Sequence, residues 1–279
     1  MKKRNFIVLG GDKRNLELVN LLWGDGHNVR NLVETDIQTI DLEDYEIIIG
    51  PLPFSHDNET INAPFHSQEL FIEEIFKGMK DGQLFIAGKI EEEHILKAKD
   101  YKINIIDYFN REEMQVLNAI PTAEGAIQLA MEYLPITIHG SNALVLGFGR
   151  IGKVLANMLN GIGANVYVLA RNYGDIAWIE NYKYSPVLFK ELSKYLLKVD
   201  VIFNTIPSIV LGEEMLVYLN KQSLIIDLAS KLGGIDFNAA KGLGINTIHA
   251  LGLPGKYAPI SAAKIIKETI YNIIEERGI

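Results

Sequence analysis

The sequence predicts an α/β protein that is built from two parallel-sheet domains. Short apolar runs typical of strands alternate with segments of helical spacing, first over residues 5–120 and again from residue 142 onward. A glycine-containing loop follows the first strand-like run of each half. Strands that alternate with helices pair in parallel through right-handed crossovers. We therefore expect two Rossmann-like domains with a cleft between them.

Length and composition fit a two-domain enzyme and argue against several other classes. The chain has 279 residues, of which 48% are apolar, so two domains with large cores can form. The net charge of −8 argues against a nucleic-acid partner, which would select a basic face. There is no cysteine, which excludes disulfides and cysteine metal sites. His139 and His249 have no ligand partner at diagnostic spacing, and His66 would reach Glu69 or Glu73 only if a helix ran there. We expect no metal.

The first residues also bear on localisation. Lys2, Lys3 and Arg4 resemble the basic start of a signal peptide, but the apolar run at residues 6–9 ends at Gly10, too soon for the apolar region of such a peptide. No run in the chain approaches the roughly 18 apolar residues of a membrane span. We expect a first strand here, a cytoplasmic protein and no membrane partner.

The first half contains five strand-like runs with helical patterns between them. The strands are expected at residues 6–9, 29–33, 46–49, 84–87 and 103–106, and the helices at residues 16–23, 68–79 and 91–97. Ligands of a parallel sheet bind at the carboxyl ends of its strands. Two loops at such ends are therefore candidate ligand-binding loops.

The loop of residues 10–14 has two glycines but lacks the third at the spacing of a nucleotide fingerprint. It could be a solvated turn, a second nucleotide site, or an anion site that combines helix N–H groups with Arg14. The loop of residues 50–56 is stiffened by two prolines. His56 in that loop either faces the cleft or is an ordinary surface histidine.

A helix is predicted to begin at Pro121, a residue type that suits the first turn, and to end before Pro135. Thr122 and Glu124 would then lie in the first turn. They would either cap the helix and complement its dipole or line the cleft. We place the domain boundary here. The domains are residues 1–120, with a C-terminal helix at 261–279 packing back on them, and residues 121–260.

The second half opens with a nucleotide-binding fingerprint. An apolar run at residues 142–146 leads into Gly-x-Gly-x-x-Gly and then into a segment of helical spacing. Such glycines permit a tight turn, close approach of the backbone to a pyrophosphate, and close helix–strand packing, while the helix N-terminus faces the anion. An ordinary tight turn is the alternative. The expected cofactor-binding residues are Gly147, Phe148, Gly149, Arg150, Ile151 and Gly152.

The next strand, at residues 165–170, ends where the adenosine ribose is usually recognised. NAD enzymes usually have a carboxylate at this point, but the chain continues with Arg171 and Asn172. A guanidinium suits a 2′-phosphate, and the amide can add a donor. We expect NADP, with NAD as the alternative, because Asp175 lies too far along the chain to mark NAD.

Three further strands are expected at residues 199–204, 223–228 and 245–250. The loop after the first of them should pass beside the nicotinamide half of the cofactor. The cofactor-binding residues predicted at these strand ends are Thr205, Ile206, Pro207 and Asp227. The second strand leads into Ser230 and Lys231, and the third leads into a loop that contains Lys256.

Several of these stretches together resemble the dipicolinate synthase A subunits of spore-forming bacteria. The residues that carry the resemblance are 118–126, 137–141 with the fingerprint, 227–231 with Gly233 and Gly234, and 250–259. The motifs span the second half, and the order of elements covers the whole chain. The Asp-x-Ala, Gly-Gly and Pro-Gly elements also look like alanine dehydrogenase and transhydrogenase subunits, and the glycine loop is similar to that of D-2-hydroxyacid dehydrogenases.

The resemblance implies an oxidoreductase that converts a dihydrodipicolinate, derived from the dihydrodipicolinate synthase product, to dipicolinate with NAD(P)+ as the hydride acceptor. It implies action during sporulation, in the mother cell. It also implies a partner, the flavoprotein-like B subunit of dipicolinate synthase. We further expect a homo-oligomer. The alternatives are a dehydrogenase of another small 2-oxo, 2-hydroxy or amino acid, and a noncatalytic nucleotide-binding subunit.

A substrate with two carboxylates requires cations or N–H and O–H donors. The substrate-binding candidates are Arg14, Thr122, Ser230 and Lys256. The candidates for the catalytic base are Lys231, Glu124 and His56. Lys231 is preferred because it follows a strand end, where the similar hydroxyacid dehydrogenases have a basic residue.

Overall fold

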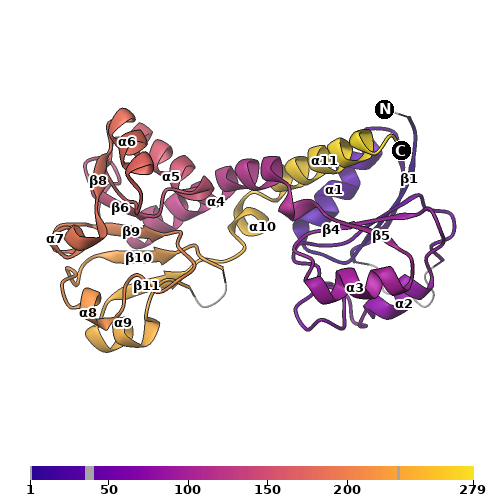
Figure 1. The fold of residues 1–279 in the computed structure, drawn as a ribbon, viewed down its shortest axis with the longest axis horizontal. Coiled ribbons are helices and arrows are strands. Elements are labelled where there is room, and N and C mark those ends of the chain that lie inside the picture. The colour runs from indigo at the N-terminus through magenta and orange to yellow at the C-terminus, as the bar shows by residue number, and fades with distance from the viewer. Residues whose placement is uncertain (1, 35–40, 231–232) are drawn as a thin grey trace. The chain divides into compact units, whose positions relative to one another are not determined.

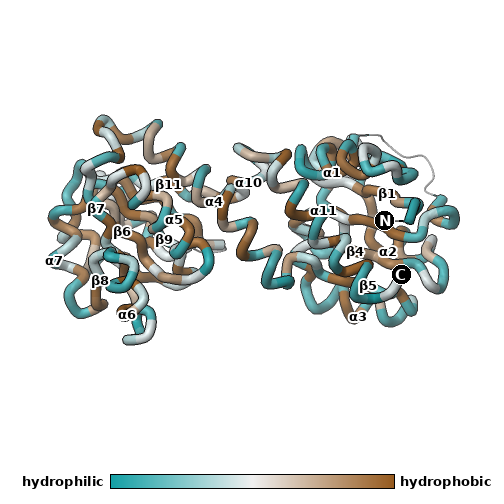
Figure 2. Tube along the Cα trace, turned by 90° about the horizontal axis from the view of Figure 1, so that it is seen from above, coloured by the Kyte–Doolittle hydropathy of each residue, from teal (hydrophilic) through white to brown (hydrophobic). Residues whose placement is uncertain are grey.

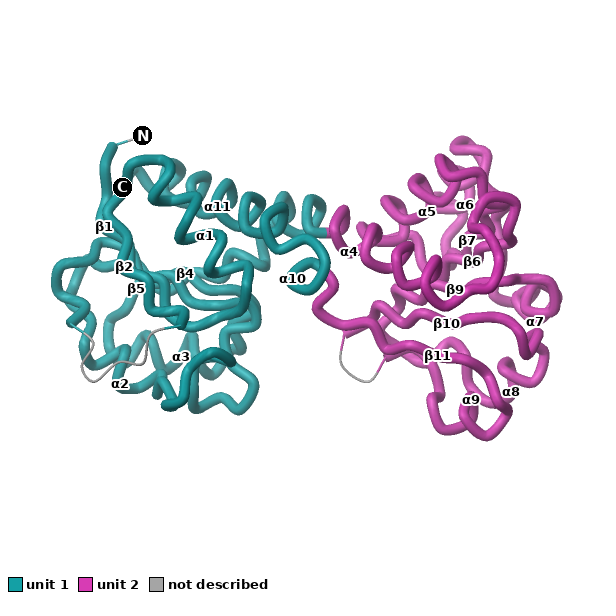
Figure 3. The backbone as a smooth tube through the Cα atoms, turned by 180° about the vertical axis from the view of Figure 1, so that it is seen from behind, with its two compact units in different colours: residues 1–118, 254–279 teal, residues 119–253 magenta. Residues whose placement is uncertain are grey.

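The computed structural model describes residues 2–34, 41–230 and 233–279, so the predicted catalytic residue Lys231 lies outside the described residues. The chain divides into two compact units (Figure 3). Unit 1 contains residues 1–118 and 254–279, and unit 2 contains residues 119–253. Each unit is built on its own sheet of parallel strands, which confirms the predicted fold class.

Unit 1 has a five-stranded sheet in the order β2-β1-β3-β4-β5. Strands β1, β4 and β5 of this sheet are labelled in Figure 1. Its strands are β1 (Asn5–Leu9), β2 (Asn28–Leu32), β3 (Ile47–Ile49), β4 (Leu84–Ala87) and β5 (Asn104–Asp107). Its helices are α1 (Lys13–Gly24), α2 (Ile72–Lys77), α3 (Glu92–Asp100), α10 (Leu253–Tyr257) and α11 (Pro259–Glu276). The strand predicted at residues 6–9 differs from β1 by one residue.

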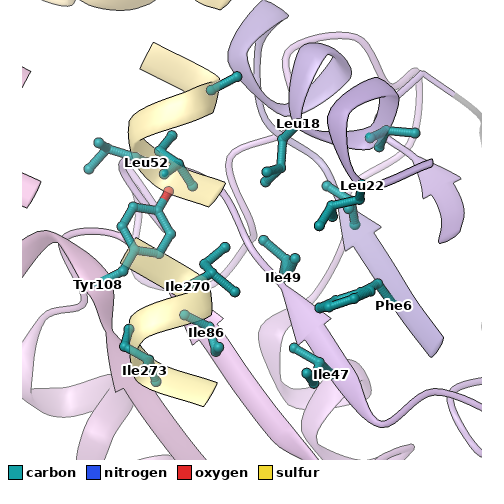
Figure 4. Close-up of a cluster of buried hydrophobic side chains, with 14 of the residues drawn as sticks. Phe6, Leu18, Leu22, Ile47, Ile49, Leu52, Ile86, Tyr108, Ile270 and Ile273 are labelled. Carbon is teal, nitrogen blue, oxygen red and sulfur yellow. The ribbon is translucent and has the colours of Figure 1, made fainter. Parts of the chain in front are cut away.

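Helices cover both faces of this sheet. On one face Phe6 and Ile49 pack against α1 and α11, as Figure 4 shows for Leu18 and Ile270. On the other face, Ile48 belongs to a second cluster that includes α2 and α3. Strands buried on both sides lack the polar alternation of a half-exposed strand, which is why they read as continuous apolar runs.

Helix α11 belongs to unit 1 and packs along α1. Lys267 and Tyr271 of α11 both donate hydrogen bonds to Asp25 at the end of α1, over 2.6 and 2.7 Å. The Tyr271 hydroxyl also lies 3.1 Å from Nε2 of His27. Polar contacts therefore fix the register of an otherwise apolar helix pair.

Unit 2 has a six-stranded sheet in the order β11-β10-β9-β6-β7-β8. Its strands are β6 (Asn142–Leu146), β7 (Asn165–Leu169), β8 (Ser185–Val187), β9 (Val201–Asn204), β10 (Leu224–Asp227) and β11 (Asn246–His249). Its helices are α5 (Arg150–Ile162), α6 (Tyr173–Asn181), α7 (Leu192–Leu196), α8 (Glu213–Leu216) and α9 (Phe237–Leu243).

The central strands β6, β9 and β10 of unit 2 are mostly apolar and buried, whereas the edge strand β11 is partly exposed. Polar residues gather in the surrounding loops and helix surfaces (Figure 2). Leu144 and Ile202 pack on one face with α7, α8 and α9. Strand β8 was not expected from the sequence. It is a three-residue edge strand with Pro186 at its centre. Proline argues against a strand in the sequence, although a sheet tolerates it in an edge strand.

The prediction of a helix that begins at Pro121 is wrong. Helix α4 (Glu112–Tyr133) starts earlier and contains Pro121 in its interior. Two glutamates in the first turn favour the earlier start because they complement the helix dipole. Thr122 and Glu124 consequently lie in the middle of the helix, where neither can cap it. The boundary between the two units, at residues 118 and 119, also falls inside this helix.

Candidate dinucleotide-binding site

The turn between β6 and α5 has the shape that a pyrophosphate site requires. Gly147 has a φ of +99°, and a Cβ on Gly152 would lie 2.2 Å from the carbonyl oxygen of Gly147. Side chains at these two positions would prevent the turn from closing. Gly149 is different, because a Cβ there would meet nothing within 4 Å. Space is therefore open beside Gly149 and in front of α5.

Helix α5 begins at a residue that has no side chain to cap it. Gly149 is the N-cap residue, and no side chain makes a capping hydrogen bond at this position. The first N–H groups of a helix lack partners within the helix and carry a partial positive charge. An anion bound at this end satisfies both requirements.

A pocket of about 440 Å³ opens beside this turn. It is lined by three segments and one further aromatic residue. These are residues 147–149 after β6, residues 169–172 with Asp175 after β7, residues 205–210 after β9, and Phe189. Of the predicted cofactor-binding residues, Gly147, Phe148, Gly149, Arg171, Asn172, Thr205, Ile206 and Pro207 line it, whereas Arg150, Ile151 and Gly152 lie just behind, in the first turn of α5.

Residues 205–207 line the same pocket as the residues that follow β7. Strands β7 and β9 flank β6 on its two sides, so the loops that follow them enclose the same space. Residues at the end of β7 recognise the adenosine ribose in this fold. The expectation that residues 205–207 border the nicotinamide half of the cofactor stays a prediction.

At that end the structure presents one free cation and one fixed carboxylate. Arg171 is exposed and makes no hydrogen bond or ion pair with any residue that the structure describes. Asn172 is the N-cap of α6: its Oδ1 accepts from the Asp175 amide (2.7 Å), and its Nδ2 donates to Asp175 Oδ2 (2.6 Å). One of the two N–H groups of Asn172 Nδ2 is thus engaged, and the prediction that Asn172 adds a donor to the cofactor stays a prediction.

Asp227 does not line the pocket, contrary to its predicted role as a cofactor ligand. Its carboxylate is fully buried and accepts hydrogen bonds from Asn204 Nδ2 (2.8 Å) and from the amides of Ala229 (3.0 Å) and Gly234 (2.8 Å). A buried carboxylate is retained when such donors satisfy it. Asp227 therefore holds the backbone after β10.

Asn204 was missed by the sequence reasoning, although it ends the strand before the pocket loop. Its Oδ1 accepts from the amide of Ile206 (3.1 Å), and its Nδ2 donates to the carbonyl of Ile206 (3.0 Å) as well as to Asp227. The pair of Asn204 and Asp227 thereby joins the loop after β9 to the loop after β10. A polar residue at a strand end within an apolar run was the available signal.

In unit 1, Arg14 is not the free cation that an anion site at α1 would need. Asp12 caps α1 by accepting a hydrogen bond from the Arg14 amide (2.9 Å). The same carboxylate accepts hydrogen bonds from Arg14 Nε and Nη2, both over 2.9 Å. Arg14 Nη2 also donates to the carbonyl of Leu52. Asp12 therefore already supplies the anion at this helix, and only Arg14 Nη1 has no hydrogen bond to the described residues.

The other predicted substrate and catalytic residues are spread over both units. In unit 1, His56 is exposed on its loop, and Lys256 is exposed in α10 with its Nζ 5.1 Å from the centroid of the Tyr257 ring. The residue before Lys256 contacts the Arg14 side chain, since a Cβ on Gly255 would lie 2.9 Å from Arg14 Nε. In unit 2, Thr122 is buried, whereas Glu124 and Ser230 are exposed.

The residues of unit 2 fit a dinucleotide cofactor. The uncapped N-terminus of α5, the open space at Gly149 and the pocket between two strand ends supply the anion site and the nucleoside site. Within the described ranges no cluster of His, Asp or Glu could hold a metal ion. No helix in those ranges is long and apolar enough to cross a membrane.

Comparison with known proteins agrees with this assignment. Residues 121–229 match the family model described as the D-isomer specific 2-hydroxyacid dehydrogenase, NAD binding domain. The sheet order, the fingerprint and this match define an oxidoreductase that uses a nicotinamide dinucleotide. The transhydrogenase from Sinorhizobium meliloti, with a TM-score of 0.69 at 16% identity over 98% of this chain and 94% of that one, shares the fold.

Residues 5–109 match the model of the N-terminal domain of the dipicolinate synthase A subunit. The chain is 31% identical to the dipicolinate synthase A subunit of Bacillus subtilis (strain 168), over 96% of this chain and 95% of the relative. The crystal structure of the Bacillus halodurans A subunit has a TM-score of 0.89 at 27% identity, with 97% of each chain covered. The B. subtilis structure has a TM-score of 0.88 at 29% identity, covering 99% of this chain and 97% of that one. The chain belongs to the family of dipicolinate synthase A subunits.

Proposed function

We propose that this chain oxidises a dihydrodipicolinate, derived from the dihydrodipicolinate synthase product, to dipicolinate. The observation that carries the proposal is the dinucleotide pocket in front of the uncapped helix α5, in a chain that matches its dipicolinate synthase relatives along almost its whole length. We infer action in the cytoplasm of the mother cell during sporulation. We also infer a homo-oligomeric state and a partner, the flavoprotein-like B subunit of dipicolinate synthase.

In this reaction the substrate loses one hydride and one proton, and its ring becomes aromatic. A nicotinamide dinucleotide held in the pocket of unit 2 would supply the hydride acceptor. The protein has two tasks, which are to hold the reacting C–H bond in position and to remove the proton. Lys231 is our first candidate for the base, and Glu124 and His56 are the others.

We infer that the cofactor is NADP rather than NAD. Arg171 supports this, because its guanidinium is exposed at the pocket and has no ion-pair partner among the described residues. A guanidinium binds a phosphate through paired hydrogen bonds. The terminal 2′-phosphate of NADP would supply the missing partner.

For the two carboxylates of the substrate we propose Arg14, Lys256, Ser230 and Thr122 as donors. Arg14 would act through Nη1, since Asp12 and Leu52 occupy Nε and Nη2. The Asp12 carboxylate holds the guanidinium in one orientation, which lowers the entropy that substrate binding would cost. Lys256 is exposed next to Gly255, which contacts Arg14.

The test is a coupled assay with the purified chain, alone and mixed with the B subunit encoded by the same organism. Each mixture receives the dihydrodipicolinate synthase product and NADP+, while NADPH absorbance and dipicolinate are followed together. We expect both products to appear at equal rates. If neither mixture forms dipicolinate, the proposed reaction is wrong, and the assay is repeated with small 2-oxo, 2-hydroxy and amino acids. A chain that binds nucleotide and turns over none of these would be a noncatalytic subunit.

A further inference from the structure

The wall of the pocket around the adenosine ribose contains a carboxylate that has no assigned role. Asp175 lines the pocket together with Arg171 and Asn172. It lies in the first turn of α6, three residues after the N-cap, and one turn of helix returns it to the strand end. The distance along the chain that seemed to exclude Asp175 therefore does not separate it from the ribose end in space.

Asn172 fixes the orientation of this carboxylate. Its Nδ2 donates to Asp175 Oδ2 over 2.6 Å, and its Oδ1 accepts from the Asp175 amide over 2.7 Å. Asp175 Oδ1 has no hydrogen bond to the described residues and is left to accept from another donor. Because Asn172 is a neutral partner, it leaves the negative charge of Asp175 in place.

Arg171 and Asp175 do not neutralise each other. Both line the pocket, yet among the described residues no nitrogen–oxygen distance of 4.0 Å or less joins their charged groups. The pocket therefore offers a cation and an anion to the same part of the ligand. A ribose 2′-hydroxyl can donate to a carboxylate, whereas a 2′-phosphate is attracted by a guanidinium and repelled by a carboxylate.

We infer that Asp175 is a cofactor-specificity residue that opposes Arg171, accepting from the 2′-hydroxyl of NAD and disfavouring the 2′-phosphate of NADP. The pocket then accepts both dinucleotides, and the preference for NADP is smaller than Arg171 alone would give. This inference rests on the use of a nicotinamide dinucleotide in the proposed function. It does not depend on which substrate is oxidised.

The experiment measures the Kd of NAD+ and of NADP+ for the full-length chain by calorimetric titration, without turnover. The variants are Asp175→Asn and Asp175→Ser. Either change should weaken NAD+ and tighten NADP+, shifting the ratio of the two Kd values toward NADP+ by about tenfold, the equivalent of one charge-assisted hydrogen bond. Arg171→Ala should shift the ratio in the opposite direction by a similar factor.

Glu180→Gln is the matched control. Glu180 is exposed near the other end of the same helix and does not line the pocket, so this variant removes one negative charge from α6 and leaves the site intact. Its Kd ratio should equal that of the wild type. Thermal melts of each variant establish that it is folded before it is titrated, and Asp175→Ser provides a second readout if Asp175→Asn disturbs the N-cap.

Two outcomes would overturn the inference. In the first, the Asp175 variants bind both dinucleotides but leave the Kd ratio within twofold of the wild type. In the second, Glu180→Gln shifts the ratio as much as they do, which would indicate a remote effect of net charge. Absence of binding of either dinucleotide to the wild type would instead overturn the proposed function together with this inference. A shifted ratio in a chain that forms no dipicolinate would uphold the inference and overturn only the proposed reaction.

Discussion

The two units differ in how they satisfy the N-terminus of the helix that follows their first strand. In each, the first strand of the unit leads through a glycine loop into a helix, β1 into α1 and β6 into α5. At α1 the protein supplies its own anion, because Asp12 caps the helix and pairs with Arg14. At α5 the cap residue is Gly149, which has no side chain to make a capping hydrogen bond. An uncapped helix N-terminus leaves more of its amides available to a ligand anion than a capped one does.

This comparison also explains why one loop carries the fingerprint and the other only part of it. The loop of unit 1 contains two consecutive glycines with positive φ, Gly10 and Gly11, followed by the capping aspartate. The loop of unit 2 places glycine at the cap itself. A single residue type at the N-cap therefore separates a structural turn from a ligand site.

Gly149→Asp should have the largest effect, because it gives α5 the cap that α1 has. The backbone at Gly149 has φ −79° and ψ −162°, which any residue adopts, and a Cβ meets nothing within 4 Å. The fold should therefore persist, with the cap adding roughly a few tenths of a kcal/mol of stability. Binding of NADP+ should weaken at least about 100-fold, because the carboxylate occupies the anion site and repels the pyrophosphate.

Titration of NADP+ into folded Gly149→Asp tests this expectation, with Gly149→Asn as the matched control of similar size without charge. The asparagine variant should bind NADP+ more tightly than the aspartate variant does. Equal binding by Gly149→Asp and the wild type would show that the pyrophosphate does not lie at α5.

The reverse change, Asp12→Ala, should destabilise unit 1 by about 2 kcal/mol and create no nucleotide site. It removes the cap of α1 and leaves the Arg14 guanidinium, whose side chain is 9% exposed, without its carboxylate partner. Urea denaturation measures the loss. Asp12→Asn keeps a capping acceptor and should recover part of the stability, whereas an undiminished midpoint for Asp12→Ala would show that the pair contributes little.

Asp227→Asn tests the buried carboxylate behind the pocket of unit 2. An asparagine amide would face the donors of Asn204, Ala229 and Gly234, and at least one hydrogen bond would be lost. We expect a loss of about 1–2 kcal/mol in the free energy of unfolding, together with a several-fold weaker NADP+ affinity because the two loops are no longer joined. Retained stability with unchanged affinity would contradict the positioning role of Asp227.

The smallest expected effect is a pH dependence that is specific to unit 1. Burial lowers the pKa of His27 from its usual value, so the folded state favours the neutral ring, whose Nδ1 accepts from the Arg4 amide. The stability contribution is complete above the unfolded pKa of about 6.5, and it is lost as the pH falls through the folded pKa, because the unfolded chain takes up the proton first. Lys267 and Tyr271 lower the pKa of Asp25, which adds a loss of the same sign below about pH 3.9.

Urea titrations at pH 7.5 and 5.5 measure this dependence. The wild type should be less stable at the lower pH, and His27→Gln should show a smaller difference between the two values. A wild-type stability that rises on acidification would mean that His27 is stabilised as a cation.

Local sequence signals predicted most of the strands and the glycine turn. Strand β4 falls at residues 84–87 as expected, because a run of buried apolar residues bounded by polar ones leaves little choice of structure. The turn at the fingerprint was predicted for a similar reason, since Gly147 and Gly152 each answer a local requirement for space. Helix α4 was misjudged because proline was read as a start, although proline can also lie inside a long helix that other contacts stabilise.

By itself, the sequence determined the two parallel-sheet units, the nucleotide turn and the cation at the end of β7, since these follow from residues that are neighbours along the chain. Only the tertiary structure decided which polar groups remain available to a ligand. Asp12 removes most of the Arg14 guanidinium from use, Asp227 lies behind the pocket wall, and Asp175 returns to the ribose end. The physical reason is that the availability of a donor or a charge depends on which partners packing brings to it, and those partners come from other turns, strands and loops.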